Sequence, residues 1–190
     1  LFEYHCMMDG LEEGRLGTRK IGTTKRGIGP AYQDKVKRTG IRASLLKRPL
    51  ELEARFRAQG EIYNSIFREA GAEELDLDAE WEKLAAAIPV IGPCVEDAVL
   101  TLNRAVAEGK SVLFEGAQGT WLDVDYGTYP YVTSSNTTSG AACTGAGMPP
   151  RCVDHVIGVV KAYTTRVGEG PFPTELDDEM GEYIRERGGE

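Results

Sequence analysis

The stretch GKSVLFEGAQGT, residues 109–120, decides the fold class. Its apolar run from Ser111 to Phe114 directly follows a helical pattern, which is typical of a buried parallel strand. A second run, VVKAYTTRV at residues 159–167, is rich in β-branched residues and precedes another glycine loop, GEGPFP. Helix, strand and glycine loop therefore occur twice in succession, and this order predicts an α/β protein.

The middle of the chain has a helical pattern instead. Pro49 suits the first turn of one helix, Asp78 is the expected N-cap of a second, and Gly109 closes a third. We expect these helices to be scaffold, because their apolar stripes fit core packing. The predicted organisation is one incomplete domain in three parts: a helix and candidate phosphate loop at 1–42, a helical subdomain at 43–110, and an α/β sheet portion with ligand loops at 111–190.

Composition limits the function classes. The chain has 190 residues, a net charge of -8 and a pI near 5.0, which argues against nonspecific binding to nucleic acid. No stretch is expected to reach the apolar length needed to span a bilayer. The four cysteines lack any CxxC spacing, so we expect free thiols in a reducing cytoplasm and no metal site. Both ends read abruptly, which favours a fragment.

Two glycine loops follow the predicted strands, where α/β sheets bind ligands. In the first, Gln118 lies between Gly116 and Gly119, and its amide can both donate to and accept from a purine carbonyl or hydroxyl. Glycine lets backbone N–H groups approach a ligand closely. The alternative is a tight structural turn.

The segment GTTKRGIGP, residues 22–30, is the candidate phosphate loop. Hydroxyls of Thr23 and Thr24 stand beside the charges of Lys25 and Arg26, although no Walker A pattern is present. Further basic residues follow directly, and an arginine among them could bind phosphate through its planar fork: Lys35, Lys37, Arg38 and Arg42. A solvated basic surface remains the alternative for both groups.

A third polar segment is YPYVTSSNTTSG, residues 129–140, in which Thr133 and its neighbours could line a ligand. An ordinary turn-rich loop would have the same composition. Asp123 and Asp125 form a carboxylate pair just before it, but alternate residues need not face one site.

Three long strings give the chain a specific resemblance: KIGTTKRGIGPAYQDKV at 20–36, VLFEGAQGTWLDVDYGTYPYVTSSNTTSG at 112–140, and VVKAYTTRVGEGPFPTEL at 159–176. In order and spacing they resemble the adenylosuccinate synthetase family. The resemblance implies part of a P-loop-type nucleotide-binding fold with a mostly parallel central sheet and a helical insertion. It also implies GTP-dependent ligation of L-aspartate to inosine monophosphate (IMP) in purine biosynthesis.

Five IMP contacts carry over from the family's motifs. Thr24 and Thr133 resemble the two threonines that hold the phosphate, and Gln118 resembles the glutamine near the purine 6-oxygen. Arg38 resembles the arginine that reaches the partner's site across a homodimer. Val167 resembles a residue packing near the ribose.

Other family parts have no match here. The GDEGKGK loop with its catalytic aspartate, the catalytic histidine, the Mg²⁺ site and the guanine-reading TKLD motif are absent, so the principal residues for GTP and Mg²⁺ are expected outside this chain. Catalytic residues are therefore expected to be absent, with Gln118 as a transition-state contact at most, and the fragment alone should be inactive. Two rival interpretations are a free-standing nucleotide monophosphate-binding module and a structural or dimerisation piece.

Overall fold

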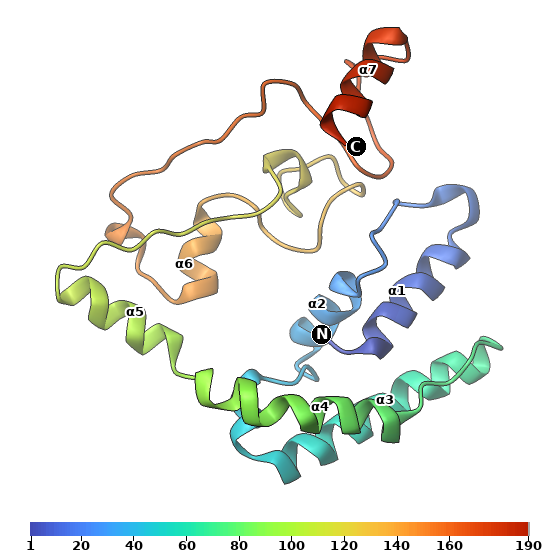
Figure 1. Cartoon of the computed structure of the whole chain (residues 1–190), viewed down its shortest axis with the longest axis vertical. Coiled ribbons are helices and arrows are strands. Elements are labelled where there is room, and N and C mark those ends of the chain that lie inside the picture. Colours follow the sequence, from blue (N-terminus) through green and yellow to red (C-terminus); the bar gives the residue numbers. More distant parts are fainter. Residues whose placement is uncertain (190) are drawn as a thin grey trace.

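The computed structural model describes residues 1–189, and all regular elements in that range are helical. The described chain contains seven α-helices, with short 3-10 turns between all consecutive pairs except α3 and α4 (Figure 1). The helices are α1 (Glu3–Arg15), α2 (Ile28–Lys37), α3 (Pro49–Glu69), α4 (Leu77–Ile91), α5 (Ala98–Ala107), α6 (Gly140–Ala146) and α7 (Glu179–Gly188).

The core lies between α1, α3 and the start of α4. Phe56, Tyr63 and Phe67 lie on one face of α3 at helical spacing and are almost fully buried. The ring of Tyr4 from α1 stacks on Tyr63 with centroids 4.6 Å apart. Burying such a side chain contributes about 1.5–3 kcal/mol, so this cluster fixes α1 firmly against α3.

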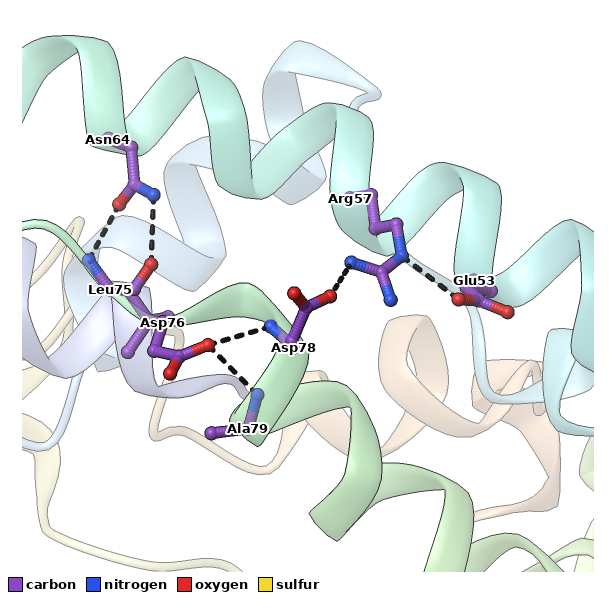
Figure 2. Close-up of polar contacts among 7 residues, drawn as sticks. All are labelled: Glu53, Arg57, Asn64, Leu75, Asp76, Asp78 and Ala79. Atoms are coloured by element: carbon purple, nitrogen blue, oxygen red, sulfur yellow. Dashed lines mark hydrogen bonds and ion pairs between the residues drawn. The ribbon is translucent and has the colours of Figure 1, made fainter.

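The turn between α3 and α4 is held by side chains that replace missing backbone partners (Figure 2). The Asn64 amide donates to the carbonyl of Leu75 at 2.9 Å and accepts from its N–H at 2.8 Å. Asp76 caps α4 by accepting from two backbone N–H groups at 3.0 Å. The predicted cap at Asp78 was therefore wrong by two residues, because burial of Leu77 in the core draws the helix start forward.

The expectation that no stretch reaches the apolar length needed to span a bilayer was wrong for residues 77–107. Within the described chain, this is the one stretch long and apolar enough to cross a membrane by length and composition, with a mean hydropathy of 1.5. The structure divides it, since α4 ends at Ile91 and α5 begins only at Ala98, after Glu96 and Asp97. Each helix by itself is shorter than the roughly 20 residues that span a bilayer.

The predicted strands are not formed in the described chain, so the mostly parallel central sheet is not confirmed. Residues 111–114 and 159–167 follow an irregular path without strand pairing, drawn in Figure 1 as bare trace. Leu113 is 87% exposed and Val159 is 93% exposed. A strand needs neighbours for its N–H and C=O groups, and a parallel strand needs cover on both faces. The described residues supply neither.

Candidate functional site

The candidate phosphate loop is attached to α1 at both of its ends. Glu13 accepts a hydrogen bond from the N–H of Gly22 at 2.7 Å, and Asp9 accepts one from the N–H of Gly27 at 2.9 Å. The two carboxylates are four residues apart on α1, so they lie on the same helix face, and both are buried. Thr24 lies between these two attachments and is exposed.

His5, one further turn along that face, attaches α2. Its Nδ1 accepts from the N–H of Phe2 at 3.0 Å, which assigns the ring proton to Nε2. That nitrogen lies 3.1 Å from a carboxylate oxygen of Asp34. Burial lowers the pKa of His5 against the opposing effect of Asp34, so a neutral histidine donates here. Gln59 of α3 donates to the same carboxylate, which joins three helices at one buried point.

Arg38 is placed by the end of α2. It has left-handed backbone geometry, with φ of 68°, and its side chain is exposed. The N–H groups of Thr39 and Gly40 donate to the carbonyl of Asp34, and the Thr39 hydroxyl donates to its carboxylate at 3.0 Å. Arg38 is separated from the Thr24 loop by the whole of α2, a helix about 15 Å long. The structure therefore places Arg38 at the opposite end of α2 from the Thr24 loop.

Asp123 organises the loop that carries Gln118 and Thr133. Its side chain is fully buried and accepts hydrogen bonds from the backbone N–H groups of Asp125, Tyr126 and Thr137. Burial alone would raise the pKa of this carboxyl, but the backbone donors outweigh it and lower the pKa to about 2. The charged form of Asp123 is thus the centre on which the loop folds.

The ends of that loop are closed by further contacts. The N–H of Thr133 donates to the carbonyl of Leu122 at 2.8 Å, and the hydroxyl of Thr137 donates to the carbonyl of Gly119 at the same distance. Gln118 is exposed next to this closure, with φ of 59°. Gln118 and Thr133 therefore belong to one folded unit.

Direct backbone contact joins the Thr24 and Val167 segments. The N–H of Glu169 donates to the carbonyl of Ile21 at 3.1 Å. A Cβ added to Gly22 would lie 2.6 Å from the Cα of Gly168, so both positions need glycine for this approach. Val167 itself is 79% exposed beside this junction.

The Thr133 segment also lies near the end of the candidate phosphate loop. A Cβ added to Gly29 there would lie 3.6 Å from the Ser134 hydroxyl. The structure thus brings together the segments of Thr24, Thr133 and Val167, with Gln118 attached through its own loop.

Several residues of the site were not singled out as its supports from sequence. The buried carboxylates of α1, Asp9 and Glu13, are the clearest, and their only signal was a spacing of four on an amphipathic helix. Thr23, by contrast, was already among the candidate loop hydroxyls, and its hydroxyl is buried without a hydrogen-bond partner in the described residues. An unpaired buried hydroxyl costs free energy, so Thr23 offers a hydrogen-bonding group that a ligand or neighbour could satisfy.

The described residues do not fit a metal site. They contain no group of three or more histidine, cysteine or acidic side chains that could hold an ion. Asp123 has its oxygens occupied by backbone donors, and Asp34 has its own occupied by His5, Gln59 and Thr39. No step can be derived through a metal bound by these side chains.

Glycine loops bearing hydroxyls, an amide and cations, and held by buried polar contacts, form the class of site that suits an anionic, nucleotide-like ligand. Comparison with known proteins makes this specific. The sequence pattern of the adenylosuccinate synthetase family matches residues 1–190, and the chain belongs to that family.

Its relatives agree with this assignment. The adenylosuccinate synthetases of Thermodesulfovibrio yellowstonii and Desulfitobacterium hafniense are each 51% identical over the whole chain, which covers 44% and 45% of their lengths. A solved structure of fully ligated adenylosuccinate synthetase from Plasmodium falciparum matches with a TM-score of 0.94 and 38% identity, over all of this chain and 45% of that one. The chain therefore spans somewhat less than half the length of these relatives.

Proposed function

We propose that the longer protein containing this segment is an enzyme, the GTP-dependent ligase that joins L-aspartate to IMP, forming adenylosuccinate in purine biosynthesis. Membership of the family supports the proposal, as does the similarity to a solved family member whose structure is fully ligated. These 190 residues would supply much of the IMP site. GTP and Mg²⁺ would be held mainly by the other half, since the carboxylates described here do not form a metal site.

The observation that carries the proposal is the junction of three loop segments, those of Thr24, Thr133 and Val167. Two hydroxyls and the backbone N–H groups near them suit a phosphate monoester. Val167, exposed beside them, would pack on the ribose. In this arrangement Thr24 and Thr133 bind and orient the IMP phosphate.

Gln118 would act at the purine ring. The reaction transfers the γ-phosphoryl group of GTP to the 6-oxygen of IMP, and the aspartate amine then displaces phosphate from that carbon. A carbonyl oxygen leaves poorly, and phosphorylation stabilises its departure. An amide side chain at the 6-oxygen can donate a hydrogen bond as charge develops there, which is a stabilisation specific to the transition state.

In the longer protein, the two predicted strand segments would also gain the neighbours that they lack in the described chain. Residues 111–114 and 159–167 would become strands of a mostly parallel sheet when the other half supplies neighbours. The apolar side chains of these segments would then be buried instead of exposed, as in a P-loop-type nucleotide-binding fold. Amide exchange of Leu113 and Val160 in a full-length protein should be strongly protected if this is correct, and fast exchange there would contradict it.

We also propose a homodimer and a cytoplasmic location. Arg38 is exposed at the end of α2 opposite to the Thr24 loop, and it would complete the partner's IMP site. The four free cysteines of the described chain fit a reducing compartment.

The ligase proposal is tested in a full-length adenylosuccinate synthetase carrying these 190 residues. Incubation with IMP, GTP, L-aspartate and Mg²⁺ should form adenylosuccinate, followed by absorbance, whereas the 190-residue chain alone should form none. IMP binding without any turnover by the full-length protein would favour a nucleotide monophosphate-binding module instead. Neither binding nor turnover would favour a structural piece.

A further inference from the structure

Arg166 is the one side chain that contacts both the Val167 and Thr133 segments among the described hydrogen bonds. Its Nη2 donates to the carbonyl of Tyr131 at 3.0 Å and to the hydroxyl of Thr128 at 3.2 Å. The same nitrogen also donates to the carbonyl of Glu169 at 2.9 Å, and Nε donates to that carbonyl at 3.1 Å. One planar guanidinium group thus connects residues 35 and more positions apart in the sequence.

The backbone is shaped to receive this side chain. Gly170 has φ of 119°, which favours glycine, and a Cβ there would contact Nη2 of Arg166 and lie 2.7 Å from the Cβ of Tyr131. Gly170 therefore leaves room for the guanidinium against the Tyr131 segment. Through Glu169, whose N–H donates to Ile21, the same junction extends to the candidate phosphate loop.

The partners of Arg166 are all neutral, two carbonyls and a hydroxyl. A guanidinium that only balanced local charge would face carboxylates, as Arg57 does with Glu53 and Asp78. Arg166 therefore contributes through its geometry. Its planar guanidinium presents several N–H donors in fixed directions, whereas a lysine ammonium is a compact point charge.

We propose that Arg166 is a positioning residue for the IMP site: it clamps the Val167 segment onto the Thr133 segment and, through Glu169, onto the Thr24 loop. It acts through these segments without touching the substrate. The inference rests on the proposed function for its substrate, but the clamp itself is a property of this chain.

The kinetic test uses a full-length adenylosuccinate synthetase carrying these 190 residues. Arg166→Ala should raise KM for IMP about tenfold or more, because two segments of the IMP site lose their common support. KM for GTP should stay within about twofold of its original value, since GTP contacts are expected elsewhere. The matched control is Arg57→Ala, which removes a guanidinium from α3 and should leave both constants within about twofold.

The Arg166→Lys variant distinguishes the hydrogen-bonding geometry of the guanidinium from its positive charge. Lysine keeps the positive charge but not the fork, so KM for IMP should remain raised by about fivefold. Full recovery with lysine would overturn the inference in favour of a charge effect. An unchanged KM in Arg166→Ala would overturn it outright.

Amide exchange tests the clamp even if the ligase proposal fails. Arg166→Ala should speed exchange at Tyr131, Thr133 and Glu169 together, while N–H groups bonded to Asp123 keep their protection. Unchanged exchange in both segments would overturn the inference whether or not the protein turns over IMP. If Arg166→Ala does not fold, Thr128→Val removes one acceptor of the guanidinium and should give the same pattern more weakly; no change there would also overturn it.

Discussion

Three residues other than glycine have left-handed backbone geometry among those described: Lys25, Arg38 and Gln118. Such geometry costs of order 1–3 kcal/mol for a residue with a Cβ, and it is concentrated at binding and catalytic sites. Arg38 and Gln118 are two of the predicted IMP contacts, and Lys25 adjoins a third, Thr24. At Arg38 this geometry is the left-handed cap that ends α2, whereas Lys25 and Gln118 have it within loops.

Asp123 leads to a prediction of pH dependence. Its folded pKa of about 2 lies below the ordinary value of 3.8, so the stabilisation is fully present above pH 3.8 and is lost as pH falls through 2. Asp123→Asn should lower the free energy of unfolding at neutral pH, and its difference from wild type should shrink between pH 4 and 2. Urea unfolding of both proteins across that range measures this. Asp154→Asn, at an exposed position, is the control, and a difference independent of pH would contradict the prediction.

Helix α1 is the element that sets the candidate phosphate loop. His5, Asp9 and Glu13 face one side at successive turns and bond to Asp34, Gly27 and Gly22 in that order. Their spacing on the helix thus fixes where the loop begins, ends and passes into α2.

Removing either carboxylate of α1 should therefore disturb the loop as a whole. Asp9→Ala and Glu13→Ala each remove a charged acceptor of a backbone N–H, and each should cost about 1.5–3 kcal/mol of stability. Both should also raise KM for IMP in a full-length enzyme. Glu3→Ala, an exposed carboxylate on the same helix, should cost less than about 0.5 kcal/mol. Denaturant unfolding compares the three, and equal costs for all would show that the attachments contribute nothing particular.

The sequence predicted the helices better than the strands. The apolar stripe that includes Tyr63 and Phe67 correctly predicts a helix, because the hydrogen bonds of a helix are internal and the local pattern suffices. The run at 111–114 is apolar and the run at 159–167 is rich in β-branched residues, but strand pairing depends on neighbours that the described chain does not supply. The motifs led to the prediction of four IMP contacts in this part of the chain, Thr24, Gln118, Thr133 and Val167. Nothing in the motifs pointed to Asp9, because an acidic residue on an amphipathic helix usually faces solvent.

At the scale of the whole molecule, the predicted IMP contacts come from segments that are far apart in the sequence. Thr24, Thr133, Val167 and Gln118 belong to joined segments, whereas Arg38 lies beyond α2 with an exposed side chain. An exposed arginine at this position is accessible to a neighbouring copy, as the proposed symmetric dimer requires.

Mixing two variants tests this assignment in a full-length enzyme. Arg38→Ala should weaken IMP binding by roughly ten- to a hundredfold, since a guanidinium–phosphate bond contributes about 1.5–3 kcal/mol. Gln118→Ala should be impaired at the purine ring instead. A mixed dimer contains one site with both native residues, so mixing should restore part of the activity that neither variant has alone. Activity equal to the average of the two separate variants would contradict a role for Arg38 across the dimer.

The double attachment of the loop to α1 also limits how this segment can change during evolution. Residues 22–27 are held at Gly22 and Gly27 by carboxylates one helical turn apart. A single-residue insertion between Asp9 and Glu13 would rotate one attachment by about 100° around the helix, and an insertion within 22–27 would leave the loop too long for its fixed ends. Substitutions at Lys25 or Arg26 leave both attachments in place. Homologous chains should therefore vary in side chains within this loop far more readily than in its length.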